Sequence, residues 1–98
     1  MTQDIQKIVQ EDERLENFNQ KTVLKVWERI EVHIEDEKLW NHNIPEVIDF
    51  SDLELSEDYI QNNILPKLKK ALVDNGVIYI EREEQSGKYN DREIWRLK

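Results

Sequence analysis

The chain has 98 residues, of which 22 are Asp or Glu and 14 are Lys or Arg, and its formal net charge is −8. This length fits one compact domain, and 38% hydrophobic residues suffice for a single core. Because phosphates repel such an acidic protein, binding to DNA, RNA or anionic membrane requires basic residues gathered on one face. The chain has no Cys, which excludes disulfides and thiolate chemistry. Lacking an apolar run long enough for a signal peptide or membrane span, it is expected to be cytoplasmic.

Neither Gly nor Pro occurs before Pro45, and two helical patterns fill this part of the chain. Over residues 3–18, a narrow apolar stripe recurs at spacings of three, four and seven, which predicts a helix. The stripe consists of Ile5, Ile8, Val9, Leu15 and Phe18. A stronger pattern predicts a core helix that starts at Thr22 as N-cap and ends near Glu35. Its apolar positions are Val23, Val26, Trp27, Ile30 and Ile34.

Residues 41–43 are polar and precede Pro45, which predicts a loop. The apolar residues from Val47 to Leu55 follow at mixed spacing. A short strand, an irregular turn and one helical turn opened by Pro45 are all compatible with this spacing.

Ser56, followed by two acidic residues, predicts the N-cap of another helix. Pro66 has no N–H and clashes with the preceding turn, so we expect this helix to stop or kink near residues 62–64. A new helix is predicted over residues 65–74, with Asn75-Gly76 as its C-terminal cap.

The apolar period changes to two after Gly76. Residues 77–82 and 92–97 alternate on a β-branched and aromatic background, and the polar residues 83–91 between them include Gly87. The pattern predicts a β-hairpin with a long loop. The expected fold class is therefore α+β and mostly helical, in one domain covering residues 1–98.

The order of these elements resembles a winged helix-turn-helix domain over residues 22–98, with residues 1–20 as an extra N-terminal helix. The stretch from Leu55-Ser56 through Lys69-Lys70-Ala71 to Gly76-Val77-Ile78 is similar to the family's pattern of leucine-serine, recognition helix, paired lysines, glycine and a hydrophobic pair. The resemblance implies that residues 65–74 enter the major groove of DNA. It also implies that the hairpin loop, residues 83–91, is a wing that contacts the flanking backbone.

The charge is divided along the chain. Residues 1–60 hold 16 acidic and six basic residues, a net of −10, whereas residues 61–98 hold six acidic and eight basic residues, a net of +2. Basic residues thus gather where the resemblance places DNA. The predicted DNA-binding residues are Asn62, Asn63, Lys67, Lys69, Lys70, Arg82, Lys88, Tyr89 and Arg92. The alternative for the lysines is a solvated helix face without a ligand.

Two functions follow from these patterns. The first is a small winged-helix protein that binds double-stranded DNA, as a transcriptional regulator or a replication or partition factor. Symmetric half-sites require a homodimer, and the stripe from Ile5 to Phe18 is the predicted dimer contact because it looks too narrow and exposed for burial. The second is an acidic winged-helix interaction module, such as a viral or plasmid-encoded inhibitor or adaptor, which binds a basic protein and not DNA.

Other chemistry finds little support in the sequence. His33 and His42 lack the spacing of a metal site, and the acidic runs lack the glycine and ligand spacing of an EF-hand, so no metal or cofactor is expected. No phosphate loop or nucleophile motif is present, so an enzyme is not expected. Trp27 and Trp95 are predicted core residues, whereas for Trp40 core packing and a partner contact both remain open.

Overall fold

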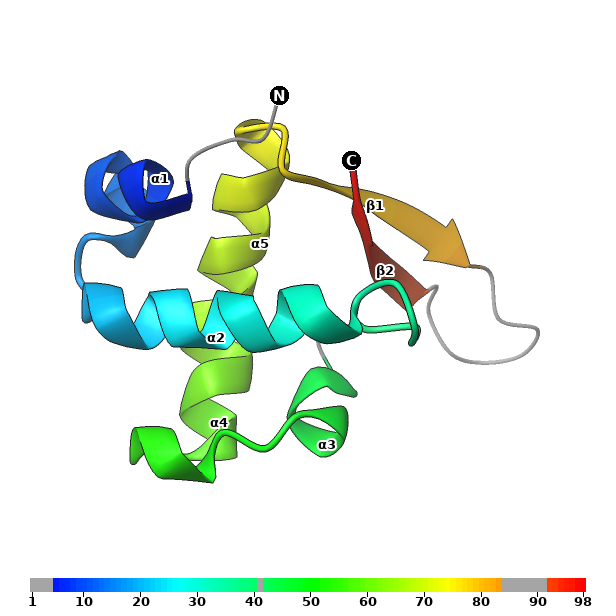
Figure 1. Cartoon of the computed structure of the whole chain (residues 1–98), viewed down its shortest axis with the longest axis horizontal. Coiled ribbons are helices and arrows are strands. Elements are labelled where there is room, and N and C mark those ends of the chain that lie inside the picture. The colour runs from blue at the N-terminus through cyan, green and yellow to red at the C-terminus, as the bar shows by residue number, and fades with distance from the viewer. Residues whose placement is uncertain (1–4, 41, 84–91) are drawn as a thin grey trace.

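The structure is a computed structural model that describes residues 5–40, 42–83 and 92–98. Its elements, in chain order, are α1 (Ile5–Glu11), η1 (Glu13–Leu15), α2 (Gln20–His33), α3 (Ile44–Val47), η2 (Ser51–Leu53), α4 (Glu57–Tyr59), η3 (Ile60–Ile64), α5 (Leu65–Asp74), β1 (Ile78–Glu83) and β2 (Arg92–Leu97). The fold is α+β and mostly helical, as predicted. In Figure 1, α2 crosses in front of the helix that ends with α5, and the hairpin extends to one side.

The N-terminal segment is two short helices rather than one. Asp12 is extended, with φ −75° and ψ 122°, and its side chain caps η1 by accepting a hydrogen bond from Arg14 N. The chain therefore turns after Glu11, and the prediction of one helix over residues 3–18 is wrong. Asp is a strong N-cap because its carboxylate satisfies a backbone N–H that has no helical partner, which outweighs continuation of the first helix.

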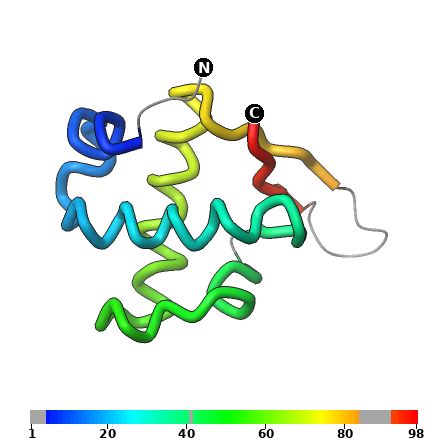
Figure 2. Tube along the Cα trace, in the orientation of Figure 1, coloured from blue at the N-terminus to red at the C-terminus, as the bar shows by residue number. Residues whose placement is uncertain are grey.

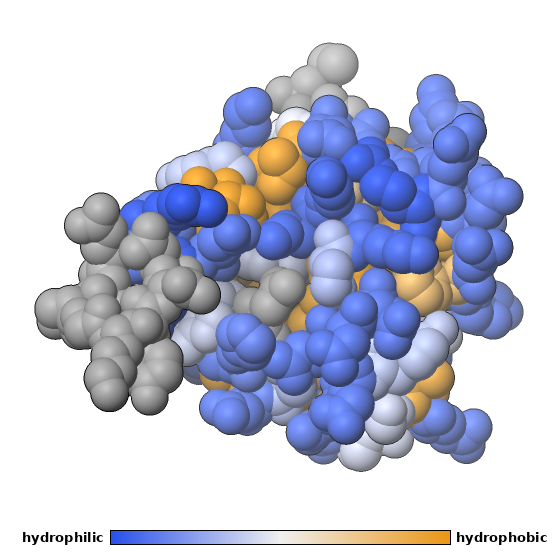
Figure 3. All heavy atoms as spheres, turned by 180° about the vertical axis from the view of Figure 1, so that it is seen from behind, coloured by the Kyte–Doolittle hydropathy of each residue, from blue (hydrophilic) through white to orange (hydrophobic). Residues whose placement is uncertain are grey.

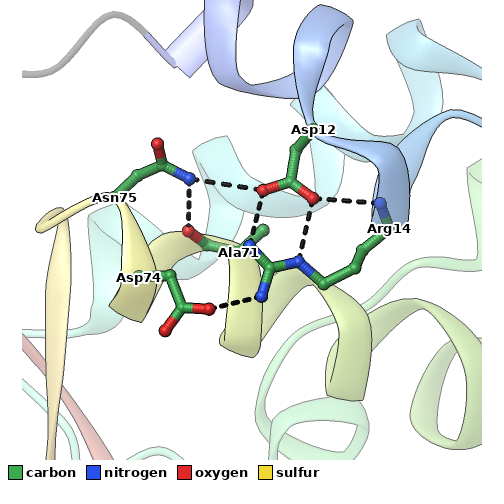
Figure 4. A network of polar contacts seen from close by, with 5 residues as sticks. All are labelled: Asp12, Arg14, Ala71, Asp74 and Asn75. Carbon is green, nitrogen blue, oxygen red and sulfur yellow. Dashed lines mark hydrogen bonds and ion pairs between the residues drawn. The ribbon is translucent and has the colours of Figure 1, made fainter.

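Arg14 and Asp12 fasten this segment to the far end of α5, as Figure 4 shows. Arg14 reaches Asp12 at 2.7 Å with one terminal nitrogen and Asp74 at 2.5 Å with the other. Asn75 donates to Asp12 at 3.3 Å and to the Ala71 carbonyl at 2.8 Å. The contact with Arg14, above all its side-chain hydrogen bond, lowers the pKa of Asp12 from 3.8 to about 2.

The second helix, α2, is close to its predicted range but is capped by Asn19, whose side chain accepts from Thr22 N at 3.2 Å. Thr22 is therefore inside the first turn and is not the cap. Further along α2, the guanidinium of Arg29 binds both carboxylate oxygens of Asp52, at 2.7 and 2.6 Å, and the carbonyl of Asp49 at 3.1 Å. This bidentate contact ties α2 to η2.

The segment with mixed spacing begins as one helical turn. Pro45 lies in the first turn of α3, where its missing N–H has no cost. Of the residues from Val47 to Leu55, however, only Val47 belongs to this turn. Ile48 is extended and residues 51–53 form η2, so no single one of the three alternatives describes the whole segment.

Ser56 caps a helix that continues through Pro66 to Asp74, and Figure 2 traces it as one coil. The Ser56 hydroxyl accepts from Tyr59 N at 3.1 Å. Between α4 and α5 the helix widens into a π turn in which Leu65 N donates to Ile60 O. The wider turn accommodates a proline that would clash with the carbonyl four residues earlier in a regular helix. Pro66 therefore distorts the helix near residues 62–64, as predicted, but does not separate two helices.

The C-terminal end of this helix is a Schellman cap. Gly76 has φ +75°, Gly76 N donates to Val73 O at 3.1 Å and Val77 N donates to Leu72 O at 2.9 Å. The cap confirms the prediction for Asn75-Gly76 and turns the chain directly into β1.

The hairpin confirms the predicted strands. β1 and β2 are antiparallel, and Ile80 is opposite Trp95. The outer edge of β2 is joined by an earlier segment, because Trp95 N donates to Leu39 O at 2.9 Å. Residue 39 thus connects the chain before α3 to the hairpin.

One cluster of buried side chains joins both strands and the helices, with the exception of α4, which has no buried residue. Trp27 and Trp95 are its largest members, which confirms both as core residues. Within residues 5–40, 42–83 and 92–98, no helix has the length and apolar character needed to cross a membrane.

Replacing Gly76 with Ala isolates the cost of the left-handed cap. A Cβ at this position meets nothing within 4 Å, so the penalty is conformational and not steric contact. We expect a loss of about 1 kcal/mol in the free energy of unfolding, measured by urea denaturation. Gly76→Asn, which tolerates this conformation better, should lose less; equal losses would contradict the explanation.

Replacing Asp12 with Asn tests the charge of the network while keeping a capping side chain. The pKa of Asp12 is lower in the folded chain, so the charged form stabilises the fold above pH 3.8 and this contribution disappears as the pH falls to about 2. Asp12→Asn should lower stability by about 1 kcal/mol at pH 7, with the difference from wild type vanishing near pH 2. Thermal denaturation at a series of pH values measures it; a difference independent of pH would be the contrary result.

Candidate nucleic-acid interface

The outer side of the helix over residues 60–74 carries three lysines and two asparagines. Lys67, Lys70, Asn62 and Asn63 are exposed, and Lys69 is half-buried. The single acidic residue in this stretch is Asp74, and it is bound by Arg14. This face of the helix therefore presents amide and ammonium groups with little local negative charge.

The lysines differ in what they contact. The ammonium of Lys67 lies over the ring of Phe18, 5.6 Å from its centroid, and Phe18 meets Tyr59 edge to face at 6.3 Å. Lys70 forms no ion pair with the part of the chain that the structure describes. The aromatic ring thus orients the ammonium of Lys67 and leaves its positive charge uncompensated by a carboxylate of the described residues.

Lys69 has a counter-charge on the hairpin. Its ammonium is 2.9 Å from one oxygen of Glu93, and the other oxygen of Glu93 is 3.6 Å from Arg82, the residue directly opposite on β1. The side-chain hydrogen bond from Lys69 is the main reason that the pKa of Glu93 lies below its usual value. Glu93 therefore joins α5 to the hairpin and lowers the positive charge that a phosphate would meet.

Arg92 stands at the start of β2 and is stacked on Trp40. The centre of its guanidinium is 4.2 Å from the centroid of the indole ring. One oxygen of Glu83 is 3.9 Å from Arg92, and the other is bound by Lys38 at 2.7 Å. The side chain of Arg92 remains 39% exposed.

Asn62 and Asn63 lie in the π turn in the middle of a continuous helix. They therefore do not flank a turn between two helices, as the separate helix predicted over residues 65–74 would have placed them. Their side chains are still exposed beside the lysines. Lys88 and Tyr89, the predicted residues of the hairpin loop, lie outside the described residues.

The N-terminal stripe lies mainly inside the chain. Val9 and Leu15 are fully buried and Ile8 is 7% exposed. Ile5 and Phe18 are partly buried against the same core. The premise that the stripe is too exposed for a core helix is therefore wrong, because the turn at Asp12 folds it onto α2 and α5.

Sequence reasoning missed four residues of this region. They are Tyr59, Trp40, Glu93 and Phe18, whose ring supports the ammonium of Lys67. Glu93 was accessible from the sequence, since pairing the two predicted strands places it opposite Arg82. No local pattern pairs Trp40 with Arg92 or Phe18 with Lys67, because these contacts join distant segments.

The surface offers little other chemistry. The described part of the chain contains no group of three His, Cys, Asp or Glu side chains arranged to hold a metal ion. His42 instead contacts the amide of Gln61 at 2.7 Å. Seen from behind, the surface is largely hydrophilic, with apolar areas in small separate patches (Figure 3).

Comparison with known proteins gives no match: no family model, no curated protein and no solved structure is similar to this chain. Arguments about its function therefore rest on its own residues.

The ion pair between Lys69 and Glu93 can be tested directly. Replacing Lys69 with Gln removes the main cause of the low pKa of Glu93, so this pKa should rise toward its usual value. NMR titration of the Glu93 carboxyl measures the change. Lys70→Gln is the matched control on the same helix and should leave the pKa of Glu93 nearly unchanged; an equal rise in both variants would refute the pairing.

Proposed function

We propose that this chain is a small winged-helix protein that binds double-stranded DNA and acts as a transcriptional regulator or a replication or partition accessory factor. The observation that carries the proposal is the exposed face of residues 60–74, where Asn62, Asn63, Lys67 and Lys70 gather and the one acidic side chain is bound by Arg14. Amides can pair with base edges and lysines with phosphates, which is the combination that a groove-binding helix needs.

The arrangement of the helices and strands supports a winged helix. The long helix follows α3 and precedes the hairpin, and residues 48–55 between α3 and Ser56 would be the turn of the motif. The hydrogen bond from Trp95 N to Leu39 O adds the earlier segment to the hairpin as a short third strand would. Glu93 holds the hairpin against the long helix.

The charges imply modest nonspecific affinity. The net charge is −8, and Lys69 and Arg92 each have a nearby carboxylate. Phosphates must compete with Glu93 for Lys69 and, more weakly, with Glu83 for Arg92, so the salt-dependent part of binding is small for a domain with this many basic residues. Contacts from Asn62 and Asn63 to bases would then carry a large share of the affinity.

The second candidate, a module that binds a basic protein, is favoured by one observation on α2. Val32 is 71% exposed, Glu28 is exposed one turn earlier on the same side of the helix, and the exposed Glu31 and Glu35 are close to Val32 in the sequence. An exposed apolar side chain with acidic residues nearby suits a basic and partly apolar partner. This candidate becomes the better one if the chain does not bind DNA.

A pair of double variants with equal net charge separates DNA binding from bulk electrostatics. Lys67→Gln with Lys70→Gln removes two charges from the proposed surface, and Lys21→Gln with Lys25→Gln removes two from exposed positions on α2. The first pair should weaken binding to random duplex DNA about tenfold and reduce the salt slope by about two, since two phosphate contacts are lost.

Fluorescence anisotropy over a range of salt concentrations measures both quantities. The control pair should bind nearly as the wild type does. Equal loss in the two pairs would contradict the assigned surface, and absence of wild-type binding would reject the DNA function.

A further inference from the structure

Hydrogen bonds to all three residues 38–40 fix the segment that carries Trp40. Leu39 O accepts from Trp95 N at 2.9 Å, the Asn43 side chain donates to Lys38 O at 2.7 Å, and Trp40 N donates to the same side chain at 2.7 Å. Leu39 itself is fully buried. The indole of Trp40 is therefore attached to a rigid part of the fold, although it lies beside a polar loop.

Arg92 uses this indole as a platform. Its guanidinium carbon lies 4.2 Å above the ring centroid. Stacking occupies a face of the planar guanidinium and leaves its N–H groups, which point outward in the plane, able to donate. A guanidinium held in this way is suited to bidentate contact with a phosphate and loses little side-chain entropy when it binds.

Among the described residues, the carboxylate within 4 Å of Arg92 is that of Glu83, and it competes weakly for these donors. Glu83 binds Lys38 at 2.7 Å, and its contact with Arg92 at 3.9 Å is longer than a hydrogen bond. The hydrogen bond from Lys38 is also the first cause of the lowered pKa of Glu83. Lys38 thus binds the carboxylate of Glu83, which would otherwise be available to Arg92.

From these contacts we infer that Trp40 is a positioning residue for DNA binding, which holds the guanidinium of Arg92 with its N–H edge ready for a phosphate beside the hairpin. The inference rests on the proposed function and adds a residue that itself need not touch DNA. If the stack only packed the hairpin, the contribution of Arg92 to binding would not depend on Trp40. If the stack positions Arg92, the two contributions are coupled.

A double-mutant cycle measures this coupling. Trp40→Leu, Arg92→Gln and the variant with both changes are compared with wild type for binding to random duplex DNA between about 50 and 200 mM salt. Arg92→Gln should weaken binding about three- to tenfold and lower the salt slope by about one. Trp40→Leu should reproduce most of both effects, and the double variant should bind no more weakly than Arg92→Gln alone.

Two conservative variants separate positioning from folding. Trp40→Phe keeps an aromatic face and should retain most of the binding, while Arg92→Lys keeps the charge but loses the stacked fork and should bind more weakly than wild type. Melting temperatures show whether each variant is folded at the temperature of the assay.

Several results overturn the inference. If the wild type binds DNA and Trp40→Leu leaves both affinity and salt slope unchanged, Trp40 does not position Arg92. The inference would also be contradicted if the effects of the two changes on DNA affinity were additive, or if Arg92→Gln left the affinity unchanged. If the wild type does not bind duplex DNA at all, the proposed function fails and the inference fails with it, so the two failures are distinguishable.

Discussion

The structure depends on one helix that stays continuous through a proline. Leu65 N reaches back five residues to Ile60 O, and the resulting π turn accommodates Pro66 without a break. The same helix supplies the buried residues Leu68 and Leu72 to the core. Its C-terminal end receives the N-terminal segment through Arg14 and, through the Schellman cap, directs the chain into the hairpin. If the helix broke at Pro66, its core residues, the N-terminal segment and the hairpin would no longer be held by one rigid element.

The electrostatics follow from where this helix lies. Its outer side is bordered by the N-terminal segment and by the hairpin, and each border supplies a carboxylate: Asp12 beside Arg14, and Glu93 beside Lys69. These carboxylates hold the borders in place. Glu93 also lowers the positive charge of the helix, so the DNA binding that we propose would depend more on the shape and amide groups of a limited surface than on net charge.

Local patterns predicted much of the fold. The apolar period of α2, the cap at Ser56, the stop at Gly76 and the two alternating strands were all accessible, because each is set by residues adjacent in the sequence. The predictions were wrong where two nearby residues compete for the same role at a helix end. Asp12 ended the first helix because its carboxylate both caps η1 and binds Arg14, and Asn19 replaced Thr22 as a cap. The apolar periodicity of a helix does not indicate which of two nearby polar residues caps it.

The sequence by itself determined the α+β class, most of the element boundaries and the concentration of basic residues after residue 60. Only the tertiary structure decided how those basic residues are used. It stacked Arg92 on Trp40, paired Lys69 with Glu93, placed Lys67 over Phe18 and buried the N-terminal stripe that looked exposed. The physical reason is that these contacts join segments far apart in the chain, and packing of the whole core, not any local propensity, brings them together.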